Sequence, residues 1–124
     1  MLAHLDELRD GMIRENGKPW AWADFEIRKT AEIFATVAER AKDPHGATYP
    51  MDSMRGCENQ RAMVYRQPTG VVGAIIPFNF PAEMLAYKVA GSLAGGNTVV
   101  VKLPEDCSLT CLRIGALMLE AGSA

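Results

Sequence analysis

The stretch VVGAIIPFNFP, residues 71–81, decides how this chain folds. Residues 71–76 are apolar on both faces, which is typical of a parallel strand covered by helices. The proline-bounded turn that follows contains one polar side chain, Asn79. The stretch therefore predicts a buried strand with Asn79 just beyond its carboxyl end.

A second apolar run, VVVKLPE at residues 99–105, ends in Lys102 and Glu105. In open parallel sheets, ligands bind in the crevice outside the carboxyl ends of the strands, so Asn79, Lys102 and Glu105 are candidates for one ligand site. Each has a simpler interpretation. An Asn between prolines is often a turn residue or a helix cap. Lys102 and Glu105 alone would suit a surface ion pair, worth less than about 1 kcal/mol.

The residues before residue 71 predict helices followed by an exposed strand. Apolar residues at helical spacing predict amphipathic helices over about 2–16 and 19–42. Residues 43–60 are rich in Pro, Gly, Asp, Ser and Asn and indicate a linker. The alternating residues 61–67 indicate an exposed or edge strand.

The residues after 71 predict two strand–helix units in series. Helices are expected over 81–93, where Pro81 fits the first turn, and over 108–120; residues 97–102 form the strand between them. The result is a right-handed βαβα segment, which is half of a nucleotide-binding fold. The chain is thus expected to be an α/β protein.

Composition excludes several classes of function. The chain has 124 residues, of which 48% are apolar and 23% charged, enough for one small globular domain. A net charge of −2 without a basic stripe argues against nucleic acid as a partner. No apolar run approaches the roughly 20 residues that span a bilayer, and His4, Asp6 and Glu7 stand where a signal peptide would be basic and then apolar. We therefore expect a cytoplasmic protein without a membrane partner.

The three cysteines do not indicate a disulfide framework or a metal site. Their number is odd, and Cys107 and Cys111, four residues apart, lack a matching His or Cys pair for zinc. Reduced, structural thiols are therefore expected.

Four blocks of this sequence, in order and at matching spacing, resemble segments of the aldehyde dehydrogenase superfamily. ENGKP at residues 15–19 is similar to the family's EQGKP, and PFNFP at 77–81 to its PWNFP. AGGNTVV at 94–100 is similar to AAGNTVV, and KLPE at 102–105 to KPSE. The likeness covers nearly the whole chain. Since the family's leading segment, its later glycine-rich segment and its Gly-Gln-x-Cys context are absent, the chain looks like an early piece of a longer enzyme.

The resemblance implies roles for residues in and next to the PFNFP and KLPE blocks. Asn79 aligns with the family's oxyanion asparagine, which donates to the oxygen that becomes charged during the reaction. Lys102 and Glu105 would meet the ribose hydroxyls of a nicotinamide cofactor. Because a carboxylate repels a 2′-phosphate, NAD is expected rather than NADP. Backbone groups and an apolar wall would come from the neighbouring residues Ile75, Ile76, Pro77, Phe78 and Pro104.

This sequence departs from the family's pattern at some of these positions. Phe78 replaces the usual Trp and lacks its indole N–H, and Leu103–Pro104 replaces Pro-Ser, so no serine hydroxyl is available. None of the three cysteines aligns with the family's nucleophile, and Cys107 stands where the family usually has a Thr that caps the next helix.

The resemblance implies that the complete enzyme oxidises an aldehyde with water to a carboxylic acid and NADH through a thiohemiacetal and a thioester. This chain alone is expected to be inactive, because the catalytic Cys and Glu are absent. Two alternatives stay open: a CoA-acylating aldehyde dehydrogenase of the same superfamily, and a truncated remnant that binds only a nucleotide or a subunit.

The resemblance also implies three segments and a partner chain. Residues 1–42 are the helical part of the cofactor domain, and 71–124 form an incomplete, Rossmann-like cofactor-binding segment. Residues 43–70 combine the linker with an edge strand or hairpin and belong to an extension that packs between subunits of a homo-oligomer, a dimer or a tetramer.

Overall fold

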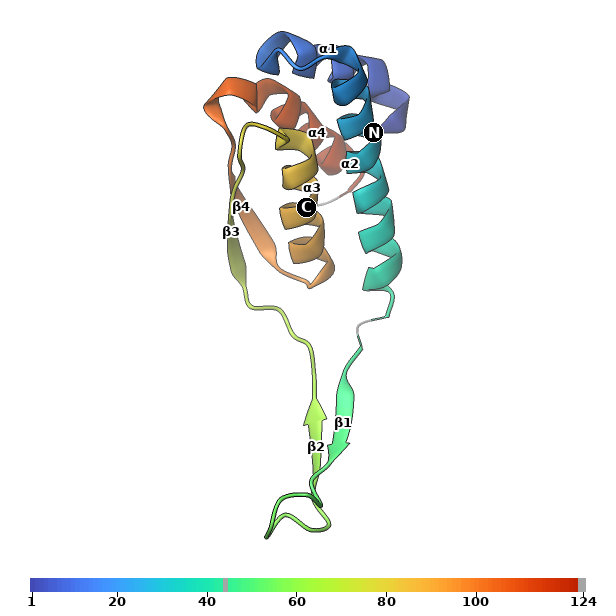
Figure 1. The fold of residues 1–124 in the computed structure, drawn as a ribbon, viewed down its shortest axis with the longest axis vertical. Coiled ribbons are helices and arrows are strands. Elements are labelled where there is room, and N and C mark those ends of the chain that lie inside the picture. Colours follow the sequence, from blue (N-terminus) through green and yellow to red (C-terminus); the bar gives the residue numbers. More distant parts are fainter. Residues whose placement is uncertain (44, 123–124) are drawn as a thin grey trace.

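The computed structural model describes residues 1–43 and 45–122, and within them four helices and two small sheets are present (Figure 1). The helices are α1 (Leu5–Asn16), α2 (Trp20–Ala41), α3 (Pro81–Ala94) and α4 (Ser108–Glu120), with 3₁₀ turns at Leu2–His4 and Glu105–Cys107. The strands are β1 (Ala47–Pro50), β2 (Arg61–Val64), β3 (Val71–Ile75) and β4 (Thr98–Lys102). The order β3-α3-β4-α4 confirms the expected partial α/β nucleotide-binding segment.

Local sequence explains where the helices begin and end. Gly17 ends α1 with φ of +68°, a left-handed conformation that residues with a Cβ rarely adopt. Pro81 lies in the first turn of α3, where its missing N–H is not needed. The four helices bury one apolar face each, and their core includes Leu8, Met12, Ile27, Leu85 and Ile114.

Strands β3 and β4 run parallel, with Val71 opposite Thr98 and Ile75 opposite Lys102. The strands were expected to be buried on both faces, and that expectation is wrong. The side chain of Val71 is 72% exposed and that of Ile75 is 70% exposed, whereas Ala74 is buried. The reason is that the helices all lie on one side of the sheet (Figure 1), so the outward-pointing residues have no cover.

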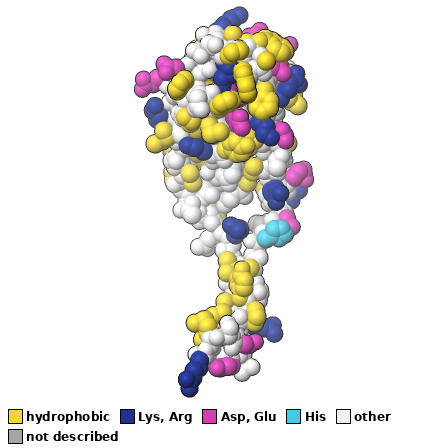
Figure 2. All heavy atoms as spheres, viewed as in Figure 1, with side chains coloured by type: hydrophobic (Ala, Val, Ile, Leu, Met, Phe, Trp, Pro, Cys, Tyr) yellow, Lys and Arg dark blue, Asp and Glu magenta, His cyan; other side chains and the backbone are white. Residues whose placement is uncertain are grey.

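Strands β1 and β2 form an antiparallel hairpin that projects from the body as an arm (Figure 1). The sequence indicated a linker over 43–60, but Ala47 pairs with Val64 and Pro50 pairs with Arg61. The linker assignment is therefore wrong for Ala47–Pro50, because a strand needs a neighbour for its backbone groups and this segment supplies it. Figure 2 shows hydrophobic side chains along this arm.

Within the described residues, no helix is both long enough and apolar enough to cross a bilayer.

Candidate functional site

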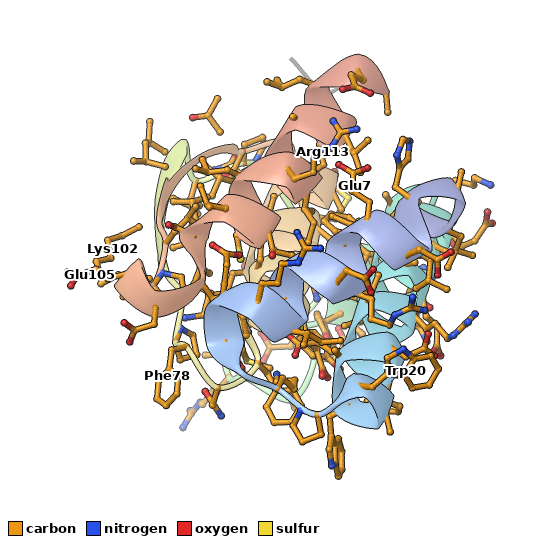
Figure 3. The ribbon with its side chains drawn as sticks, turned by 90° about the horizontal axis from the view of Figure 1, so that it is seen from above. Glu7, Trp20, Phe78, Lys102, Glu105 and Arg113 are labelled. Carbon is orange, nitrogen blue, oxygen red and sulfur yellow. The ribbon has the colours of Figure 1, made fainter. Side chains whose placement is uncertain are left out.

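The parallel register brings the two candidate stretches to the same edge of the sheet. The N–H of Ile76 donates to the carbonyl oxygen of Lys102 at 3.0 Å, so both strands end side by side. Figure 3 shows Phe78, Lys102 and Glu105 on one side of the body. We call this place the strand-end edge and the residues 77–80 that leave β3 the Asn79 turn.

Most of the candidate residues at the strand-end edge are exposed. Phe78 is 59% exposed, and Pro77, Asn79, Lys102 and Glu105 are also exposed. Lys102 and Glu105 form no ion pair, with each other or with another residue in the described part of the chain, so the surface ion pair is not what the structure shows.

Ile76 and Pro104 differ from the other candidates because both are buried. They were expected to help form the edge, but their side chains face the interior, and only their backbone groups can serve a ligand. The alternation of a strand explains this for Ile76, since its exposed neighbour Ile75 points to the opposite face.

The Asn79 turn is held by hydrogen bonds to its backbone. The side-chain amide of Asn16 donates to the carbonyl of Phe78 at 2.8 Å, and the ammonium of Lys18 donates to the carbonyl of Asn79 at 2.7 Å. The Asn79 side chain itself makes no hydrogen bond among the described residues. It is also not a helix cap, because the N-cap position of α3 is Phe80.

The beginning of α3 is capped by a carboxylate from another helix. Glu26 of α2 is fully buried, and its Oε1 accepts hydrogen bonds from the N–H groups of Ala82 at 2.9 Å and Glu83 at 3.3 Å. Its other oxygen pairs with the Lys18 ammonium, which also lies 4.2 Å from the centre of the Phe80 ring. We call Lys18 and Glu26 the buried pair.

Sequence reasoning missed the buried pair, although one signal was present. Glu26 lies on the buried stripe of α2, between Ala23, Ile27 and Thr30 at helical spacing. A carboxylate in the middle of an apolar stripe needs a partner, because an unpaired buried charge is very costly.

A second carboxylate, Glu15 of α1, caps α4. It accepts hydrogen bonds from the N–H groups of Leu109 and Thr110, both at 2.7 Å, and from the Thr110 hydroxyl at 2.5 Å. Burial tends to raise the pKa of Glu15, but the hydrogen bonds from Thr110 and then Leu109 outweigh it and leave the pKa below its ordinary value. Cys107 is the N-cap residue of α4, yet its side chain makes no capping bond.

Two of the three thiols are poorly suited to act as nucleophiles. Burial, followed by the charge of Glu15, raises the pKa of Cys107 to about 12. Burial, followed by Cys107, raises the pKa of Cys111 to about 12. Since the thiolate is the reactive form, both thiols stay protonated and inert near neutral pH. Cys57 lies far from them along the chain, in the loop of the arm, and is half-buried.

Comparison with known proteins identifies the family. A model described as "Aldehyde dehydrogenase family" matches residues 1–123. The mitochondrial succinate-semialdehyde dehydrogenase of Arabidopsis thaliana is 41% identical over 122 residues, which is 98% of this chain and 22% of that protein. The NADP(+) succinate-semialdehyde dehydrogenase of Escherichia coli K12 is 37% identical over 122 residues, which is 98% of this chain and 24% of that protein.

A solved structure shows the same fold. The succinate-semialdehyde dehydrogenase from Burkholderia pseudomallei has a TM-score of 0.89 and 37% identity, and the match covers 99% of this chain and 25% of that one. This chain thus spans about a quarter of the length of the proteins it matches. Sequence and fold agree over nearly all of it, and the chain belongs to the aldehyde dehydrogenase family.

Proposed function

We propose that this chain is part of the cofactor-binding region of an NAD-dependent aldehyde dehydrogenase and supplies its oxyanion donor, Asn79. One observation carries the proposal: the Asn79 side chain is exposed and makes no hydrogen bond among the described residues, on a turn whose backbone is held at two carbonyls. A free amide on a fixed backbone suits a group that must stabilise charge in a transition state.

The chemistry of aldehyde oxidation explains why an amide suits this place. When a nucleophile adds to the aldehyde carbonyl, negative charge develops on the oxygen, and an N–H donor stabilises it. The Asn79 amide offers two such donors without a net charge of its own. In this proposal the thiol nucleophile comes from another part of the complete enzyme, since Cys107 and Cys111 are buried and protonated and Cys57 lies in the loop between β1 and β2.

The strand-end edge has the composition that a nicotinamide dinucleotide requires. Ile75 and Phe78 provide exposed apolar surface, and Glu105 provides a carboxylate able to accept hydrogen bonds from a ribose. When bound, this cofactor accepts the hydride that leaves the substrate. Glu105 would hold the ribose and would disfavour a 2′-phosphate by charge repulsion, which favours NAD.

The test is the substitution Asn79→Ala in the complete enzyme. We expect turnover to fall by about 10² to 10³ while the dissociation constant for NAD stays nearly unchanged. Asn79→Asp keeps the size, loses the amide N–H donors and adds a negative charge beside the developing one, so its turnover should be at least as low as that of Asn79→Ala. The control is Asp10→Ala, which removes an exposed polar side chain of α1 that belongs neither to the Asn79 turn nor to the arm. Normal single-turnover chemistry with a tenfold weaker NAD affinity would instead make Asn79 a cofactor contact.

We further propose that the arm, residues 43–70, packs against another subunit of a homo-oligomer. The support is the composition of the arm. In the single chain its large apolar side chains are exposed to water, among them Tyr49, Met63, Val64 and Tyr65. Large exposed apolar side chains of this kind are typical of protein interfaces, and a partner would also cover the free edges of the hairpin.

A further inference from the structure

The buried pair contacts the Asn79 turn and the first turn of α3, which follows it directly. Lys18 binds the carbonyl of Asn79 and lies over the ring of Phe80. Glu26 binds the N–H groups of Ala82 and Glu83, which are the first free donors of α3. Two side chains therefore fix the backbone at and after Asn79. Both lie much earlier in the sequence, 56 to 61 residues before the groups that they bind.

Stability alone is a poor reason for this arrangement. Removing two charges from water is expensive, and apolar residues of similar volume often serve a core as well or better. Capping alone does not require the pair either, because a Ser, Thr, Asp or Asn at the N-cap position would bond the same N–H groups locally. Here the N-cap residue is Phe80, which has no capping group.

A local cap would also be a problem for the neighbouring amide. A polar side chain at position 80 would lie next to Asn79 and offer it a hydrogen-bond partner within the turn. The buried pair satisfies the backbone from the core side and leaves the Asn79 side chain exposed. The buried pair thus holds the backbone of the turn, and the amide of Asn79 remains free to bind another group.

We propose that Lys18 and Glu26 are positioning residues for Asn79 in the reaction. This inference rests on the proposed function, in which Asn79 is the oxyanion donor. A donor stabilises a transition state only when it is held close to its productive geometry, and a shift of about 1 Å can reduce turnover by about a hundredfold. The pair acts through Asn79 and contacts no reacting atom.

The experiment is a double-mutant cycle in the complete enzyme. The first change is Lys18→Met together with Glu26→Gln, which removes both charges, leaves no unpaired buried ion and keeps an oxygen to cap α3. The second change is Asn79→Ala. Single-turnover rates, the KM for aldehyde and the dissociation constant for NAD are measured for the wild type, each variant and the combination. Cooperative thermal unfolding checks that each variant folds.

A matched control comes from the same helix. Lys29 and Glu32 form an ion pair of 3.1 Å on α2, and neither side chain makes a hydrogen bond to the Asn79 turn in the described part of the chain. Lys29→Met with Glu32→Gln makes the same chemical changes and should leave the single-turnover rate unchanged.

We expect Lys18→Met/Glu26→Gln to slow the single-turnover rate about tenfold or more with little change in NAD affinity. In the Asn79→Ala background, the same pair of changes should have almost no further effect, because the group that it positions is gone. Equal losses in both backgrounds, or no loss in the wild-type background, would overturn the inference. If Asn79→Ala itself leaves turnover unchanged, the proposed role of Asn79 fails and this inference fails with it.

Discussion

Glu105 is the residue that decides between the two nicotinamide cofactors in our proposal. The structure leaves its carboxylate exposed beside the end of β4 and without an ion-pair partner in the described part of the chain. No neighbouring cation among the described residues neutralises this carboxylate, so its charge acts on a ligand that comes close. Lys102, also exposed, can attract a phosphate once that carboxylate is removed.

We predict that Glu105→Gln in the complete enzyme narrows the preference for NAD over NADP about fivefold. Two like charges about 4 Å apart repel strongly at an effective dielectric constant near 20, and even a quarter of that repulsion shifts the ratio of dissociation constants by this amount. The gain in NADP binding should shrink as salt rises, because salt screens the attraction to Lys102. Titration of both cofactors at low and high salt measures both effects.

The control for this prediction is Asp106→Asn. Asp106 is the next residue, it is exposed, and its substitution removes the same charge. It should change the cofactor ratio less than Glu105→Gln does. If the ratio of the dissociation constants for NAD and NADP is unchanged in Glu105→Gln, Glu105 lies away from the ribose.

At the scale of the element, α4 depends on a carboxylate that belongs to α1. Glu15 accepts three hydrogen bonds from the first turn of α4. The side chain of the N-cap residue Cys107 makes no capping bond and instead donates to Glu15 at 3.6 Å. The contact therefore joins the two helices as well as capping one of them. A negative charge at a helix N-terminus is also favoured by the helix dipole.

We predict that Glu15→Gln lowers the free energy of unfolding by about 1 kcal/mol at pH 7, because it removes the charge and one of the two oxygens that accept hydrogen bonds from α4. The pKa of Glu15 in the folded chain lies below its ordinary value of 4.5. The stabilisation by the charge is therefore complete above the unfolded pKa and is lost as pH falls through the lower, folded pKa. The free energies of unfolding of wild type and Glu15→Gln, measured from pH 7 down to about pH 3, test this pH dependence.

In the same experiment, Glu39→Gln is the control, since Glu39 is exposed on α2 and caps no other helix. The difference in the free energy of unfolding between wild type and Glu15→Gln should narrow below pH 4.5. The corresponding difference for Glu39→Gln should stay small at every pH. If the difference in the free energy of unfolding for Glu15→Gln does not depend on pH, packing and not the charge of Glu15 causes the loss of stability.

At the scale of the whole molecule, the arm and the body differ in how much apolar surface they bury. The body has a buried core of its own, whereas the arm consists of two short strands and a loop with large apolar side chains in water. An isolated two-stranded hairpin is marginally stable in water. A partner surface would supply the burial that the arm lacks.

We predict that Met63→Ser with Tyr65→Ser converts the complete enzyme from a dimer or tetramer into smaller species. The reason is the loss of apolar area from the arm, where these side chains are 62% and 74% exposed in the single chain. Sedimentation gives the mass, and circular dichroism checks that the helices of the body persist. Leu2→Ser, on the body, is the control. A wild-type mass in the double variant would contradict the proposal.

The sequence by itself determined the order of the helices and of strands β2, β3 and β4, and the place of Asn79. Apolar spacing in α1 and α2, Pro81 at the start of α3 and the apolar runs of β3 and β4 are local signals, and they act over a few neighbouring residues. The parallel pairing followed from the βαβα order. For that reason the residue pattern alone was enough to assign Asn79, Lys102 and Glu105 to one edge.

Only the tertiary structure decided what holds that edge in place. Glu26 caps a helix 56 positions later, and Glu15 caps one 95 positions later. The sheet is also open on one face, although its strands are apolar on both. These features depend on how the helices pack against one another and against the sheet. Local periodicity records which face of an element is apolar, but it carries no information about which distant backbone group a buried carboxylate will meet.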